Sequence, residues 1–137
     1  MVFVTSSIGA DGLFTNNQLL ISLPEAPKPI EVKVTATMYF ADTLCCDADP
    51  LITAGMYHIN PKKASKQRYV ALSRNLLKRW NGAFSYGDKI RIKGAGKKDG
   101  IYKVVDTMNP KFTDRLDFLE TAGTKIYKYN NVSITKV

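Results

Sequence analysis

The 137-residue sequence is poor in the residues that build metal centres and disulfide frameworks. It contains one histidine and two cysteines, which are adjacent at Cys45 and Cys46. One histidine excludes a multi-histidine metal site, and two cysteines exclude a disulfide framework and a four-cysteine zinc site. We therefore expect no metal and no cofactor. If the protein is an enzyme, its chemistry is expected to rest on carboxylates, because His58 is the single histidine that could assist a nucleophile.

Long apolar runs are also missing. No stretch approaches the roughly 20 apolar residues that a membrane-spanning helix needs, so no transmembrane segment is expected. The N-terminus does not resemble a signal peptide, because it has no basic region and its apolar stretch is interrupted by Asp11, Asn16 and Asn17. A processed form, another export route or retention where the protein is made all fit this pattern.

Acidic residues are scarce relative to basic ones. The chain has 20 Lys and Arg against 12 Asp and Glu, a net charge of +8, and its length favours one domain. Residues 24–29 (PEAPKP) hold three of the six prolines and predict an extended linker. We place an N-terminal arm with this linker at 1–31 and a domain at 32–137. The arm carries a net charge of −2 and the domain one of +10. The arm could be a tail, an edge strand or a segment for protein assembly, and the sequence leaves these roles open.

Most of the domain shows the patterns of short strands. Residues 32–40 alternate apolar and polar side chains, with Val34 and Ala36 on one face and Lys33 and Thr35 on the other, which is typical of a strand. Residues 73–80 predict one short helix with Ser73 as its N-cap. A glycine-rich turn at 94–100 predicts a hairpin. Further strands are predicted at 68–72, 89–93, 101–106, 115–119, 125–129 and 131–137, so the fold class is all-β, a small barrel or sandwich.

The basic residues raise the question of nucleic acid. Lysines and arginines cluster at 62–68 and 74–79, with interleaved aromatic residues that could stack on bases: Tyr57, Tyr69, Trp80 and Tyr86. No helix-turn-helix, zinc finger or RNP-type run accompanies them. The sequence GAGKKDG at 94–100 lacks the spacing of a phosphate-binding loop and leads into a strand. Nucleic acid is therefore kept only as a minor alternative.

The acidic residues are distributed more informatively. Asp106, Asp114 and Asp117 fall within one 12-residue window, DTMNPKFTDRLD. Asp117 interrupts the apolar strand RLDFL, and burial would raise its pKa, as a general acid requires. Alternation places Arg115 on the same face of the strand as Asp117, and the positive charge of Arg115 would lower the pKa of Asp117. The pattern alone supports a catalytic site and a structural ion pair equally.

At these residues the chain resembles a known family. The sequence YKVVDTMNPKFTDRLDFL resembles the signature of the three-aspartate (3D) domain, in which a strand ends in Asp-Thr and an Asp follows eleven residues later; here these are Asp106-Thr107 and Asp117. Three further stretches agree in order and spacing: VTATMY at 34–39, DPLITAG at 49–55, and YVALSRNLL followed by FSYGDKIRIKG. The resemblance covers residues 32–137.

This resemblance implies a fold and a substrate. The fold is a six-stranded double-psi β-barrel, shared with MltA-type lytic transglycosylases, RlpA-like proteins and expansin domains. The substrate is peptidoglycan, cleaved at β-1,4 bonds to N-acetylmuramic acid. Two departures concern the groove: relatives carry Gly-Gly-Ala-Ile-Lys-Gly where this chain has MNPKF at 108–112, and the C-terminal Trp-Gly of some relatives is absent.

The resemblance also assigns residues. Asp117 corresponds to the catalytic carboxylate, and Asp106 lines the same groove and supports it. Asp49 and Thr53 correspond to groove-facing positions of the family, whereas Asp114 sits where relatives carry a variable residue. From the residues themselves, we expect Thr107, Asp114, Tyr39 and His58 also to contact substrate.

Two classes of function remain open on the sequence. The first is a lytic transglycosylase with a single catalytic Asp, or a hydrolase with a carboxylate pair. The second is a non-catalytic glycan-binding module that stacks sugars on Tyr39, Tyr57 or Trp80, as in expansin-like proteins. The cationic domain suits an anionic cell-wall polymer. We accordingly expect the periplasm or cell envelope, with a phage virion as an alternative location.

Overall fold

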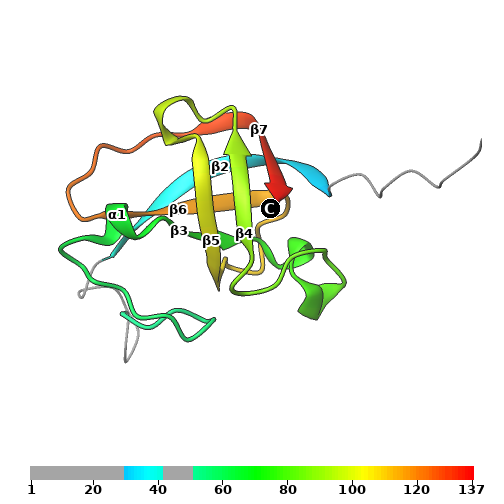
Figure 1. Ribbon diagram of the computed structural model, residues 1–137, viewed down its shortest axis with the longest axis horizontal. Coiled ribbons are helices and arrows are strands. Elements are labelled where there is room, and N and C mark those ends of the chain that lie inside the picture. Colours follow the sequence, from blue (N-terminus) through cyan, green and yellow to red (C-terminus); the bar gives the residue numbers. More distant parts are fainter. Residues whose placement is uncertain (1–29, 42–50) are drawn as a thin grey trace, which may run out of the picture.

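The computed structural model describes residues 30–41 and 51–137, which form a closed barrel of six strands in the order β2-β6-β3-β5-β4-β7 (Figure 1). Residues 1–29 of the predicted N-terminal arm, together with Cys45, Cys46 and Asp49, lie outside the described residues. The strands are β2 (Glu31–Ala41), β3 (Tyr69–Leu72), β4 (Lys89–Lys93), β5 (Gly100–Thr107), β6 (Arg115–Thr121) and β7 (Tyr129–Lys136). The all-β prediction is confirmed.

Two of the six strand pairs are parallel. These are β2 with β6 and β3 with β5, and the other four neighbours are antiparallel. Figure 1 shows β4 and β5 crossing in front of β2, β6 and β3. This mixed pairing is compatible with the double-psi arrangement that the resemblance implies.

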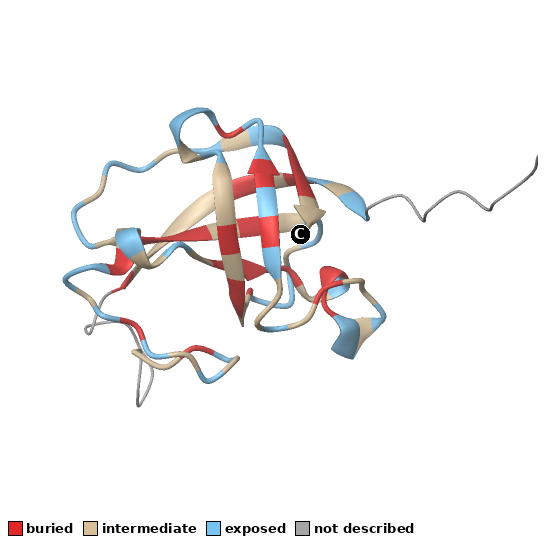
Figure 2. Ribbon diagram, viewed as in Figure 1, coloured by how far each residue is buried: buried red, intermediate tan, exposed pale blue. Residues whose placement is uncertain are grey.

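The barrel interior is filled by the inward-facing positions of every strand. On β6 these are Leu116 and Phe118, and on β3 they are Val70 and Leu72, all at most 1% exposed. Figure 2 shows the buried residues concentrated on the strands and the exposed ones on the connections. Since adjacent residues of a strand point to opposite sides, Asp117 and Ala71 lie on the outer face.

The predicted helix at 73–80 is wrong. This segment forms two 3-10 turns, η1 (Arg74–Leu76) and η2 (Lys78–Trp80), separated by Leu77 in an extended conformation. The reason is that Leu76 and Leu77 are both buried, and their neighbourhood pairs with Phe84: Phe84 N donates to Leu76 O at 2.9 Å and Lys78 N to Phe84 O at 2.8 Å. Ser73 makes no capping hydrogen bond there.

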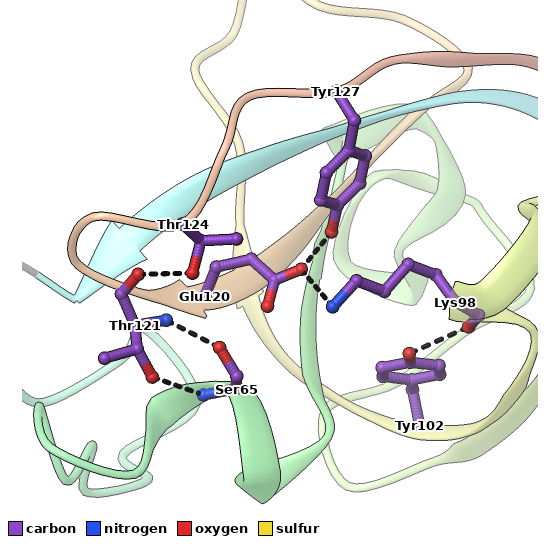
Figure 3. A network of polar contacts seen from close by, with 7 residues as sticks. All are labelled: Ser65, Lys98, Tyr102, Glu120, Thr121, Thr124 and Tyr127. Atoms are coloured by element: carbon purple, nitrogen blue, oxygen red, sulfur yellow. Dashed lines mark hydrogen bonds and ion pairs between the residues drawn. The ribbon is translucent and has the colours of Figure 1, made fainter.

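Two further elements differ from the prediction. The one α-helix of the described residues is α1 (Ala64–Gln67), which the sequence did not indicate. The predicted strand at 125–129 contributes only Tyr129, the first residue of β7. Residues 125–128 do not pair, and Tyr127 in this segment turns toward the end of the barrel instead (Figure 3). The predicted β4–β5 hairpin is confirmed, with η3 (Gly96–Lys98) in its turn.

A buried polar network closes the end of the barrel near α1 (Figure 3). Glu120, 2% exposed, follows Leu116 and Phe118 in the inward phase of β6. Its carboxylate pairs with Lys98 Nζ at 2.7 Å and accepts a hydrogen bond from the Tyr127 hydroxyl. Burial raises the pKa of Glu120, but hydrogen bonds from Lys98, Tyr127 and Ser65 outweigh it and hold the pKa below its ordinary value.

The described helices offer no membrane span: none of them is long and apolar enough to cross a bilayer.

Candidate active site

Four neighbouring strands place one row of residues on the outer face of the barrel. Thr37 on β2 pairs with Asp117 on β6, Asp117 pairs with Ala71 on β3, and Ala71 pairs with Asp106 on β5. Residues directly opposite one another share a face. With neighbouring strands about 4.8 Å apart, the Cα atoms of the two aspartates are separated by roughly 10 Å. Ala71, which lies between them, contributes only a methyl group and is 3% exposed.

A β-bulge in β5 turns Asp106 toward this face. The register between β3 and β5 shifts between Val70, which pairs with Val104, and Ala71, which pairs with Asp106. Uninterrupted alternation would have pointed Asp106 inward with Val104. The extra residue at Val105 reverses the phase, and bulges commonly redirect side chains in this way next to active sites.

Asp117 is a half-buried carboxyl whose pKa is raised above its ordinary value. Burial raises its pKa, and the charge of Asp106 adds to this effect. A hydrogen bond donated by the Thr37 hydroxyl and the positive charge of Arg115 act in the opposite direction, but the net effect is a raised pKa. The prediction that Arg115 shares a face with Asp117 and opposes the effect of burial is therefore confirmed.

Asp106 is held by three donors. Its Oδ1 accepts hydrogen bonds from the backbone N–H of Ala54 at 2.9 Å and of Thr107 at 3.0 Å, and its Oδ2 accepts one from the Tyr39 hydroxyl at 3.3 Å. Such donors suit an ionised carboxylate. Together with the bond from Gly55 N to Val105 O at 2.9 Å, they fix the loop after residue 51 against the end of β5.

Tyr39 connects the two carboxylates. It lies on β2, two residues after Thr37, so its side chain reaches across β6 and β3 to bond Asp106 on β5. Burial raises the pKa of Tyr39, and the negative charges of Asp106 and Asp117 raise it further. Tyr39 therefore remains a neutral hydrogen-bond donor beside both aspartates.

The other predicted substrate contacts lie in different places. Thr53 is 4% exposed, and its hydroxyl accepts a hydrogen bond from Tyr57 N at 3.1 Å, which supports the loop that carries Ala54. Thr107 follows Asp106 and pairs with Leu72. His58 is exposed, and its backbone forms a β-bridge with Ile52. Among the described residues, the His58 side chain makes no hydrogen bond or ion pair with Asp106 or Asp117.

Asp114 belongs to a separate arrangement. Its exposed carboxylate accepts a hydrogen bond from Asn75 Nδ2 at 2.7 Å, and its backbone N–H donates to Asn75 Oδ1 at 3.1 Å. It lines a pocket of about 270 Å³ together with Lys33 and Asn131, and neither Asp106 nor Asp117 borders that pocket. The structure thus brings together Tyr39, Asp106, Thr107 and Asp117, and sets Asp114 apart.

Sequence reasoning missed two contributors. Thr37, the partner of Asp117, lies inside the VTATMY motif, but only the parallel pairing of β2 with β6 reveals its role. Tyr86, considered only as a base-stacking residue, lies close enough to Asp106 for the charge of that carboxylate to raise the pKa of Tyr86. A Cβ on Gly55 would lie 3.0 Å from Tyr86 Cγ, so Tyr86 packs directly against the loop that Asp106 anchors.

The arrangement can supply a proton from Asp117 beside an anchored second carboxylate.

In residues 30–41 and 51–137, no group of three or more His, Cys, Asp or Glu side chains is placed to hold a metal ion. A comparison with protein-family models finds no match, and a search of curated proteins finds no relative.

Proposed function

We propose that this protein is a 3D-type double-psi β-barrel that cleaves the glycan strand of peptidoglycan as a lytic transglycosylase. The observation that carries the proposal is the half-buried Asp117 carboxyl, whose pKa is raised by burial and which shares the outer face of the barrel with Asp106. A raised pKa lets a carboxyl keep its proton to higher pH, which favours a role as general acid. The resemblance of 32–137 to the 3D signature supplies the substrate.

The proposed reaction uses one carboxyl twice. Asp117 donates its proton to the glycosidic oxygen as the bond between that oxygen and C1 of N-acetylmuramic acid breaks. The resulting carboxylate then accepts the proton of the sugar's 6-hydroxyl as its oxygen bonds to C1. The products are a 1,6-anhydro sugar and a free 4-hydroxyl, and Asp117 regains its proton without the participation of water.

The neighbours of Asp117 assist in this proposal without reacting. The Thr37 hydroxyl orients the carboxyl and stabilises the carboxylate formed midway. Tyr39, held by Asp106, covers the site from the side of β2. Thr37, Tyr39 and Asp106 are therefore positioning residues. The cationic domain would concentrate the protein at the anionic wall, reached from the periplasm, the cell envelope or a virion.

Digestion of purified peptidoglycan followed by mass spectrometry tests the proposal. We expect anhydro-muropeptides from the wild-type protein and a loss of at least about 100-fold in Asp117→Asn, the smaller end of what a general acid contributes. Asp99→Asn is the matched control, because this exposed carboxylate lies in the β4–β5 turn and its acceptor role toward Ala95 N survives in Asn. It should cleave like the wild type.

Other product patterns would overturn the proposal. Reducing ends in place of anhydro sugars would make the protein a hydrolase. Tight binding without any product would make it the non-catalytic glycan-binding module that the sequence left open.

A further inference from the structure

A second feature adjoins the aspartate site at the edge where β3 and β5 end. These strands are parallel, so the chain leaves both at the same edge of the barrel. Met108 N donates to Leu72 O at 3.0 Å, which ties the two exits together. The segment after β3, with Arg74, Arg79 and Trp80, therefore lies beside the segment after Asp106 and Thr107.

This segment encloses a small apolar pocket of about 130 Å³. Its base is formed by the buried Leu77 and Phe84, and its rim includes Arg79, Trp80 and Tyr86. A base of aliphatic and aromatic carbon with a polar rim suits the apolar face of a sugar ring.

Arg79 on this rim and Arg74, which also contacts Trp80, have no acidic partner among the described residues. The guanidinium carbons of Arg74 and Arg79 lie 4.9 and 5.2 Å from the centroid of the Trp80 ring. The ion pairs within 30–41 and 51–137 are Lys98–Glu120 and Lys136–Asp88, so neither arginine is neutralised there. Arg74 Nε is buried without a hydrogen-bond partner, which is an energetically costly state.

Arginine held on an aromatic ring is suited to bind carboxylates. The guanidinium is always charged, is less strongly hydrated than an ammonium group and offers paired N–H donors that match two carboxylate oxygens. Cation–π contact with Trp80 holds each guanidinium near the ring in advance. The rim is thus built for a ligand that joins a carboxylate to an apolar face.

Tyr86 links this pocket to the aspartate site. Burial raises the pKa of Tyr86, and among its charged neighbours Asp106 raises the pKa while Arg79 and Arg74 lower it. Its side chain also contacts Gly55 in the loop bonded to Asp106. Tyr86 therefore lies close both to the loop bonded to Asp106 and to Arg79 on the rim of the pocket.

We infer that Arg74, Arg79 and Trp80 form a subsite that binds a carboxylate carried by the glycan strand, next to the sugar at the aspartates. This rests on the proposed function and identifies the acidic part of its substrate. The carboxylate has two sources: the lactyl group of N-acetylmuramic acid, free in strands stripped of peptide, or the stem peptide attached to that lactyl group.

Binding measured with the Asp117→Asn protein separates this inference from catalysis. Three ligands share the β-1,4 backbone: stripped strands with free lactyl carboxylates, strands with stem peptides, and neutral chitin oligosaccharides. In the Asp117→Asn background, Arg79→Gln should weaken binding of at least one carboxylate-bearing ligand by about tenfold. A loss of this size corresponds to one hydrogen bond to a charged group. Its affinity for chitin oligosaccharides should stay within about twofold. The ligand that is weakened identifies the source of the carboxylate.

Two further variants keep the test decisive. Arg79 is exposed, so its replacement preserves the fold, and Arg74→Lys adds a variant that keeps the charge but loses the paired donors. Lys93→Gln removes the same charge from an exposed position on β4 and should not weaken binding. Equal losses for charged and neutral ligands, or an equal loss in Lys93→Gln, would overturn the subsite.

The two proposals can fail independently. Anhydro products together with unchanged binding in Arg79→Gln would refute the subsite alone. Arginine-dependent binding without any cleavage by the wild-type protein would refute the catalytic proposal and leave the subsite standing.

Discussion

The Thr37 hydroxyl donates a hydrogen bond to the Asp117 carboxyl across the parallel pair β2 and β6. The same hydroxyl oxygen lies 3.5 Å from Arg115 Nη2, so a chain of contacts leads from the guanidinium through Thr37 to Asp117. Burial raises the pKa of Asp117, whereas Thr37 and Arg115 lower it. Thr37 carries no charge, so its replacement can change the pKa of Asp117 without altering the net charge of the site.

Thr37→Val should extend cleavage activity to higher pH. Valine keeps the shape and strand preference of threonine but cannot donate to the carboxylate. The pKa of Asp117 then rises further, and since cleavage needs the protonated acid, the alkaline limb of the pH profile of kcat/KM should move to higher pH. We expect the free energy of unfolding to fall by about 1 kcal/mol, the value of one hydrogen bond.

Thr37→Ser is the control for this change, because it restores the hydroxyl and should restore the wild-type alkaline limb. If the alkaline limb of Thr37→Val lies at the same pH as that of the wild type, and the maximal rate is unchanged, Thr37 does not act on the pKa of Asp117.

Asp117→Asn should stabilise the fold while it removes cleavage. The pKa of Asp117 is raised in the folded state, so the folded state binds this proton more tightly than the unfolded chain. Stability of the wild-type protein is therefore lost as pH rises from the unfolded pKa through the folded one. Asparagine does not titrate and its side-chain oxygen still accepts from Thr37.

Denaturant unfolding of both proteins across this pH range provides the measurement. The difference in unfolding free energy, Asp117→Asn minus wild type, should grow with pH and then become constant. A difference that shrinks with rising pH would mean that Asp117 is better stabilised as a carboxylate than its burial suggests.

The sequence predicted the barrel better than it predicted the surroundings of the aspartates. Period-two alternation in residues 32–40 and 89–93 is a local property, and it located β2 and β4 correctly. Alternation also placed Arg115 on the face of Asp117. Alternation could not show that Asp106 shares this face, because the bulge at Val105 depends on pairing with β3.

The wrong helix at 73–80 has a related cause. Its residues have acceptable helix propensity, but tertiary pairing with Phe84 requires an extended Leu77, and such context overrides propensity. The same is true of Thr37, since no local pattern shows which residue lies opposite Asp117 in a parallel pair. Contacts across strands that are distant in sequence decide the site, and these became visible only with the fold.

Glu120→Gln should destabilise the protein near neutral pH and much less in acid. Glutamine keeps an acceptor for Tyr127 but leaves Lys98 without its charged partner in a nearly closed barrel end (Figure 3). Hydrogen bonds to charged groups contribute about 1.5–3 kcal/mol, and since Lys98 is 29% exposed we expect a loss of about 1.5 kcal/mol, at the lower end.

The pH dependence follows from the lowered pKa of Glu120. Its contribution to stability is present above the unfolded pKa and is lost as pH falls through the folded pKa. The stability difference between wild type and Glu120→Gln, measured by denaturant unfolding, should therefore shrink as the solution is acidified. Lys97→Gln, which removes an exposed charge next to Lys98, should change stability little at any pH. A Glu120→Gln protein as stable as the wild type at neutral pH would mean that desolvation of Glu120 costs as much as its ion pair returns.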